Sequence, residues 1–271
     1  MPSRLTNPLF IEFDGRQLTV TTDVEDVHDF VTATFRHMLV PAVTSSVGEL
    51  SVLRVADGYE LRGRETTFIG GTLPEPAYHM VKDEVRIAFM RSRADLLWLH
   101  AGAVERDGHA LLLSGPSGQG KSTLSTLLSG RGWKYMSDDI VPVRMENHHA
   151  IPFPQTPARR VHPGREVTVH EVATLRRESA HLERGSVYRG EAPIRAVAFI
   201  KYQASTDATV ARLSKGHSAF ALLSNLTNFM DHRSSAVDHA VAFARNIPMF
   251  SLDYTEPESG ADALSSLWAD L

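Results

Sequence analysis

Near the middle of the chain stands the stretch Leu111-Leu112-Leu113-Ser114-Gly115-Pro116-Ser117-Gly118-Gln119-Gly120-Lys121-Ser122-Thr123-Leu124. It fits the pattern G-x-x-x-x-G-K-[ST], with Gly115, Gly120, Lys121 and Ser122 at the defining positions. The leucines before the loop predict a buried strand, and the apolar spacing after it predicts a helix. Glycines let backbone N–H groups turn inward around a phosphate, and the start of the helix adds a positive end. The sequence therefore predicts a site for a nucleoside triphosphate.

Each part of this loop has an expected task. Lys121 is expected to neutralise the β- and γ-phosphates, and the Ser122 hydroxyl is expected to sit on Mg²⁺. The expected ligands are ATP and Mg²⁺, although a loop that reads phosphates does not by itself choose ATP over GTP. The residues expected to contact the nucleotide are Gly115, Pro116, Ser117, Gly118, Gln119, Gly120, Lys121, Ser122 and Thr123.

The composition excludes several classes of protein. The chain has 271 residues, 42% hydrophobic and 22% charged, which is typical of a globular protein. A formal net charge of −4 gives no general attraction for nucleic acid or an anionic membrane. Without cysteine, disulfides and thiol catalysis are excluded. No signal peptide and no apolar run of about 18 residues is found. We expect a soluble, cytoplasmic protein with no membrane or nucleic-acid partner.

Residues 1–95 are expected to form an N-terminal α+β subdomain. Apolar runs at 9–13 and 17–20 flank Asp14-Gly15, and those at 50–55 and 59–62 flank Asp57-Gly58. Each pattern predicts a β-hairpin. Helices are expected at about 24–38 and 74–91, from their apolar spacing. This region holds no recognisable group of catalytic residues.

Residues 96–271 are expected to form the catalytic α/β domain. An apolar strand at 96–104 is joined through Arg106-Asp107-Gly108 to the strand that enters the phosphate loop, so the sheet should be mixed. Further strands are expected at 133–137, 140–143, 194–200, 208–213 and 249–254, and further helices at 218–230, 234–245 and 261–271.

A second feature is the acidic pair Asp138-Asp139, which follows a strand downstream of the loop. In phosphoryl transfer one carboxylate can hold Mg²⁺ while another accepts a proton from the attacking hydroxyl. Two adjacent carboxylates repel each other, and a metal ion allows both to stay ionised. An isolated pair would be a solvated turn, but its place after a phosphate loop favours a catalytic role.

Three blocks together resemble the HPr serine kinase/phosphorylase superfamily. They are Leu99-His100-Ala101-Gly102-Ala103-Val104, Gly115-Pro116-Ser117-Gly118-Gln119-Gly120-Lys121-Ser122 and Gly132-Trp133-Lys134-Tyr135-Met136-Ser137-Asp138-Asp139. The loop is also similar to that of ATP-dependent phosphoenolpyruvate carboxykinases. The resemblance is strong over residues 96–143, weaker through 247–252, and does not reach the first ninety residues.

The resemblance implies a fold and a set of roles. The fold would be a phosphate-loop kinase core of the HPr-kinase/PEP-carboxykinase type with a mixed sheet. Ser122 and Asp139 would serve Mg²⁺, Asp138 would be the general base, and His100 would line the site beside the loop. The activity would be transfer of the γ-phosphoryl group of ATP to a hydroxyl.

The sequence departs from that superfamily at two points. Thr123 stands where the HPr kinases have an acidic residue, and their downstream signature loop is not recognisable. Kinase chemistry is therefore implied better than phosphorylase chemistry. Relatives of this class phosphorylate a serine of a precursor peptide, such as a lasso precursor, so the expected acceptor is a peptide serine or a small-molecule hydroxyl. Two alternatives stay open: a non-catalytic ATP-binding switch and a phosphorylase-type enzyme.

The remaining charged residues give weaker indications. If an arginine takes part in catalysis, Arg159 or Arg160 is the candidate, because guanidinium groups stabilise a transferring phosphoryl group. The same region can equally be a solvated face. The 13 histidines show no zinc-site spacing. Homo-oligomers are possible, but the sequence shows no interface.

Overall fold

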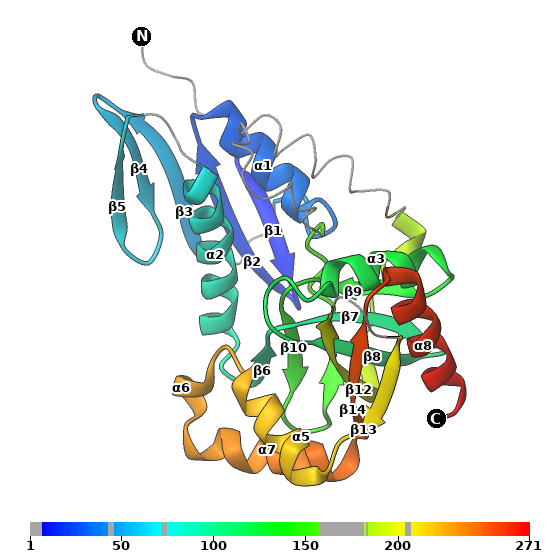
Figure 1. Cartoon of the computed structure of the whole chain (residues 1–271). Coiled ribbons are helices and arrows are strands. Elements are labelled where there is room, and N and C mark those ends of the chain that lie inside the picture. Colours follow the sequence, from blue (N-terminus) through cyan, green and yellow to red (C-terminus); the bar gives the residue numbers. More distant parts are fainter. Residues whose placement is uncertain (1–6, 43–45, 72–74, 158–181, 183, 204–206) are drawn as a thin grey trace. The chain divides into compact units, whose positions relative to one another are not determined.

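The computed structural model describes residues 7–42, 46–71, 75–157, 182, 184–203 and 207–271 (Figure 1). They divide into two compact units. The N-terminal unit runs to Arg93 and also takes in the segment that begins at Gln155; the C-terminal unit comprises Ala94–Pro154 and Leu182–Leu271. Each unit is described by itself.

The N-terminal unit contains one five-stranded sheet in the order β1-β2-β3-β4-β5. Strands β1 and β2 pair antiparallel, as do β3 and β4, so both predicted hairpins are confirmed. Strand β5, which the sequence pattern did not indicate, pairs antiparallel with β4. The elements are β1 (Leu9–Phe13), β2 (Arg16–Thr22), α1 (Glu25–Phe35), β3 (Ser46–Val55), β4 (Gly58–Arg62), β5 (Thr66–Gly70) and α2 (Glu75–Ser92).

Both helices of this unit pack together through aromatic side chains. Phe30 of α1 meets Tyr78 of α2 edge to face, with ring centroids 5.1 Å apart. Thr156 belongs to this unit because its N–H donates to the Thr34 carbonyl (2.8 Å) and its hydroxyl donates to the Ala33 carbonyl (2.7 Å). Residues just beyond Pro154 are thus tied to α1, which the sequence division at 95/96 did not anticipate.

The C-terminal unit carries the phosphate loop between β8 and α3 (Figure 1). Its elements are β6 (Leu96–Leu99), β7 (Ala101–Arg106), β8 (His109–Ser114), α3 (Lys121–Gly130), β9 (Lys134–Ser137), β10 (Val141–Arg144), β11 (His149–Ala150), a 3₁₀ turn (Arg184–Ser186), β12 (Ala192–Tyr202), β13 (Thr209–Arg212), α5 (Lys215–Ser224), α6 (Phe229–His232), α7 (Ser234–Asn246), β14 (Met249–Tyr254) and α8 (Pro257–Ala269).

The strands of this unit form a mixed sheet, as predicted. Among the described residues its main path has the order β6-β10-β11-β12-β8-β7-β9, and β14 joins β12 with β13 on its far side. Strand β8 is parallel to β12, which is parallel to β14. Because β7 is antiparallel to both β8 and β9, those two strands also run the same way. The C-terminal ends of β8, β9, β12 and β14 therefore share one edge, where ligands bind in open α/β sheets.

Helices cover both faces of this sheet. Alternate residues of β8 point to opposite sides: Leu112 joins a core with Leu222 and Phe243, from α5 and α7. Leu111 joins a second core with Leu124 and Leu264, from α3 and α8. Side chains of successive strand residues alternate between faces, so this division follows from the strand itself. The described C-terminal unit is a mixed α/β layer structure.

Three predicted boundaries were wrong. The apolar run at 96–104 is not one strand: it breaks at His100, where the backbone N–H donates to the Asn225 carbonyl (2.7 Å), and β6 and β7 pair with different neighbours. The helix expected at 218–230 ends at Ser224, and a separate short helix, α6, follows. The last helix begins at Pro257 rather than at residue 261, because proline at the first helical position is pre-set for helix entry.

No helix in the described ranges is long and apolar enough to cross a membrane.

Candidate active site

The phosphate loop requires glycine at its last turn. Gly120 has a φ of +89°, in the left-handed region, and precedes Lys121, the first residue of α3. A Cβ at Gly120 would lie 1.9 Å from the Tyr254 hydroxyl oxygen. Both the backbone angle and the lack of space exclude a side chain here. The motif's second glycine is therefore explained by the fold of this chain.

Lys121 is buried against its own loop. Its side chain is 6% exposed, and Nζ donates to the Gly115 carbonyl (2.6 Å) and the Pro116 carbonyl (3.0 Å). A buried ammonium group needs such partners, because leaving it without hydrogen bonds is costly. The loop thus holds a positive charge beneath its backbone, at the place where the motif predicts phosphate.

His100 connects that lysine to the acidic pair. Its Nε2 lies 3.0 Å from Lys121 Nζ, and its Nδ1 lies 2.9 Å from the Asp139 carbonyl oxygen and 3.3 Å from Asp139 Oδ1. An ammonium group only donates, so Nε2 accepts and the ring proton sits on Nδ1, where it donates to Asp139. His100 lies at the break between β6 and β7, and this break positions the ring.

The two aspartates of the pair have different surroundings. Asp138 is 4% exposed, and its Oδ1 accepts a hydrogen bond from the Ser122 hydroxyl at 2.8 Å. Asp139 has a side chain that is 33% exposed and a left-handed φ of +72°, which turns it away from its neighbour. Non-glycine residues in this region are uncommon and often lie at functional sites. The pair is therefore split between Ser122 on one side and His100 on the other.

Two tyrosines that are not among the predicted site residues form hydrogen bonds with the loop. The Tyr254 hydroxyl donates to the Gln119 carbonyl (2.7 Å), and the Tyr202 N–H donates to Gln119 Oε1 (2.7 Å). Burial, followed by the nearby Tyr202, raises the pKa of Tyr254 to about 12. Tyr254 therefore stays protonated and keeps donating at neutral pH. Their position at the ends of β12 and β14 was the available signal, but it required the sheet order.

The other predicted residues fall into two groups. Pro116, Ser117, Gly118 and Thr123 lie on the exposed side of the loop and of the first turn of α3. Arg159 and Arg160 lie outside the described residues. Within the described ranges, no cluster of three or more histidine or acidic side chains could by itself hold a metal ion.

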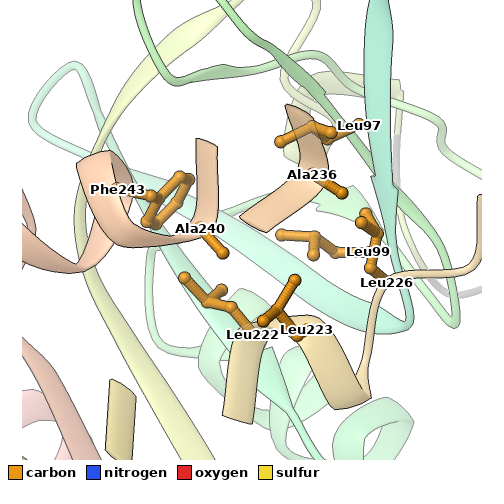
Figure 2. Close-up of a pocket in the computed structure, with 8 residues that line it drawn as sticks. All are labelled: Leu97, Leu99, Leu222, Leu223, Leu226, Ala236, Ala240 and Phe243. Atoms are coloured by element: carbon orange, nitrogen blue, oxygen red, sulfur yellow. The ribbon is translucent and has the colours of Figure 1, made fainter. Parts of the chain in front are cut away.

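An apolar cavity elsewhere in the unit is not part of this site. Figure 2 shows that aliphatic and aromatic side chains of β6, α5, the segment after it and α7 point into it. Its volume is about 10 Å³, which is room for no more than about one water molecule. The lining residues are Leu97, Leu99, Leu222, Leu223, Leu226, Ala236, Ala240 and Phe243. A cavity this small and apolar is a packing gap in the core.

Comparisons with known proteins match one family model and 46 chains of solved structures, of which one is described below. A family model described as "SynChlorMet cassette protein ScmC" matches residues 77–256, about two thirds of the chain. A solved structure, the Hpr(Ser) kinase/phosphatase from Coxiella burnetii, is 14% identical; the match covers 64% of this chain and 99% of that chain, with a TM-score of 0.33. A TM-score of this size does not establish a common fold. No curated protein sequence matches the chain.

Proposed function

The chain belongs to the family of SynChlorMet cassette protein ScmC, and for this member we propose an ATP- and Mg²⁺-dependent phosphotransferase that acts on a hydroxyl group. One observation carries the proposal: Ser122 contacts Asp138 directly, and Lys121 is linked to Asp139 through His100. Phosphoryl transfer needs a cation at the phosphates, a metal-holding carboxylate and a proton acceptor. This cluster offers all three within one edge of a sheet.

The donor atoms fit Mg²⁺. Ser122 lies in the first turn of α3 and Asp138 lies just after β9, and their oxygens Oγ and Oδ1 are 2.8 Å apart. Mg²⁺ prefers oxygen ligands. The ion usually takes one or two carboxylates and completes its shell with water and substrate phosphates. The lack of a three-carboxylate cluster in the described residues agrees with this mode. When bound, Mg²⁺ would offset the charge on the β- and γ-phosphates.

We assign the two carboxylates in the opposite order to the one implied by the family resemblance. The family resemblance implies Ser122 and Asp139 as metal ligands and Asp138 as the base. The contacts pair Ser122 with Asp138, which is nearly buried. Asp139 is more exposed, so it is better placed to reach the hydroxyl of an incoming acceptor. We therefore assign metal binding to Ser122 and Asp138 and proton acceptance to Asp139.

In the proposed reaction one proton is transferred, one bond to phosphorus forms and one bond to phosphorus breaks. The acceptor hydroxyl gives its proton to the Asp139 carboxylate, while its oxygen forms a bond to the γ-phosphorus of ATP. The bond between that phosphorus and the β–γ bridging oxygen breaks, and ADP leaves. His100 donates Nδ1–H to the Asp139 backbone carbonyl, and the same nitrogen lies 3.3 Å from Asp139 Oδ1, so the ring helps to position this aspartate. Lys121 neutralises charge on the phosphates.

The acceptor is a hydroxyl on a peptide or a small molecule. The test is mass spectrometry of candidate acceptors incubated with Mg-ATP and the protein, with serine-containing peptides first and free serine second. The proposal expects a product heavier by one phosphoryl group. The product should disappear with Lys121→Ala and persist with Lys134→Ala, a matched change of an exposed lysine on β9. Tight ATP binding without any product would favour a nucleotide-dependent switch instead.

A further inference from the structure

Tyr202 is an exposed aromatic side chain tied to the phosphate loop. It is the last residue of β12, the strand beside β8, and the residue is 50% exposed. Its backbone N–H donates to Gln119 Oε1 at 2.7 Å. The backbone of Tyr202 therefore lies at the sheet edge, one Gln119 side chain away from the loop.

Tyr254 supports one side of the Tyr202 ring. Tyr254 lies edge to face with it, with centroids 5.8 Å apart and planes at 78°. Tyr254 is itself 1% exposed and bonded to the Gln119 carbonyl. Both tyrosines thus hold the same loop residue. A ring that is supported on one side and belongs to an exposed residue can stack on a flat ligand group with little loss of conformational freedom.

The strand order tells which part of a nucleotide would reach this ring. The acidic pair follows β9, on the opposite side of β8 from β12. Ser122 and Asp138 therefore mark the γ-phosphate end of the loop. The nucleoside end of the same molecule leaves on the side away from the acidic pair, toward the end of β12. Tyr202 stands there.

We propose that Tyr202 stacks on the base of the bound nucleotide. This inference rests on the proposed function, since it presumes that the loop binds a nucleoside triphosphate. The other exposed aromatic side chain in the described part of this unit, Phe220, lies on α5. Every base has a π face, so stacking adds affinity without choosing adenine over guanine. ATP and GTP should benefit equally from Tyr202.

The test is isothermal calorimetry with ATP, GTP and inorganic tripolyphosphate, which has the phosphates but no base. Tyr202→Ala should lower the affinity for both nucleotides by about 5- to 100-fold, the range that base stacking on an aromatic side chain typically contributes. The affinity for tripolyphosphate should change less than about 2-fold, because this ligand has no base. Tyr202→Phe should keep the wild-type affinity for all three, because the ring remains. Phe220→Ala is the matched control and should leave the affinity for all three ligands unchanged.

Each other result overturns the inference in a recognisable way. Equal weakening of ATP and tripolyphosphate by Tyr202→Ala would mean that Tyr202 acts only through Gln119 and the loop. Unchanged ATP affinity would mean that the base does not touch the ring. If the wild-type protein binds neither ATP nor tripolyphosphate, the proposed function fails, and the stacking role fails with it.

Discussion

Lys121 Nζ lies 3.0 Å from His100 Nε2, and the opposite nitrogen of the same ring contacts Asp139. A single imidazole thus joins the cation of the phosphate loop to the acidic pair. A neutral ring can serve both partners, because one nitrogen accepts while the other donates. The cation proposed to bind the phosphates and the carboxylate proposed to accept the proton are therefore linked through one ring.

His100→Ala should lower turnover. The change removes the acceptor for Lys121 and the donor to Asp139, and a hydrogen bond to a charged group contributes about 1.5–3 kcal/mol. We expect a fall of about 10- to 100-fold in kcat with ATP affinity less affected. Steady-state kinetics with the acceptor found by mass spectrometry measures this. His109→Ala, a change of an exposed histidine at the start of β8, is the control; equal kinetics for both variants would contradict the role of His100.

Replacing each of the two aspartates by asparagine should have a different effect. Asp139→Asn should reduce kcat by about 10²–10⁴-fold with near-normal Mg-ATP binding, because proton acceptance is lost. Asp138→Asn should instead raise the Mg²⁺ concentration needed for half-maximal activity, because a metal-holding oxygen is weakened. Magnesium titrations at saturating ATP separate the two effects. The reverse pattern would restore the assignment that the family resemblance implies.

Gly120→Ala should block nucleotide binding, and Tyr254→Phe should partly restore it. The added methyl group would lie 1.9 Å from the Tyr254 hydroxyl oxygen, but 3.2 Å from its Cζ. Removing the hydroxyl therefore relieves the worst contact, while the strain of the left-handed φ stays. A double-mutant cycle of ATP affinity should show favourable coupling. Strict additivity would contradict this account of the loop.

Tyr254 should give the protein a pH-dependent share of its stability. Its pKa is raised from 10.0 to about 12, so the folded state favours the protonated phenol. The stabilisation is complete below pH 10 and is lost as the pH rises toward 12. The difference in unfolding free energy between wild type and Tyr254→Phe should shrink across that window. Burial also raises the pKa of Tyr78, but that residue is present in both proteins and cancels. A constant difference would contradict the prediction.

Local patterns predicted the features that depend on neighbours in sequence. The strand–loop–helix around Lys121 follows from apolar spacing and glycine, and both N-terminal hairpins follow from Asp-Gly turns. The turn at Arg106-Asp107-Gly108 likewise predicted the hairpin of β7 and β8. These elements need no knowledge of distant partners.

Features set by distant partners were not predictable in the same way. The apolar run at 96–104 has no local breaker at His100, since its one glycine, Gly102, lies inside β7. The break at His100 depends on pairing with β8 and β10 and on the Asn225 carbonyl. Tyr202 and Tyr254 reach the loop only because β12 and β14 lie beside β8. The division of roles between Asp138 and Asp139 depends on which side chain each one meets. By contrast, Pro257 was a legible start signal for α8.

The most direct measurement is phosphorus NMR of the protein with Mg-ATP and a hydroxyl acceptor. The account predicts that the γ-phosphate resonance of ATP declines while ADP and one phosphomonoester resonance grow in equal amounts, and that Lys121→Ala stops all three changes. Growth of inorganic phosphate alone, or an unchanged ATP spectrum despite binding, would contradict phosphoryl transfer to an acceptor hydroxyl.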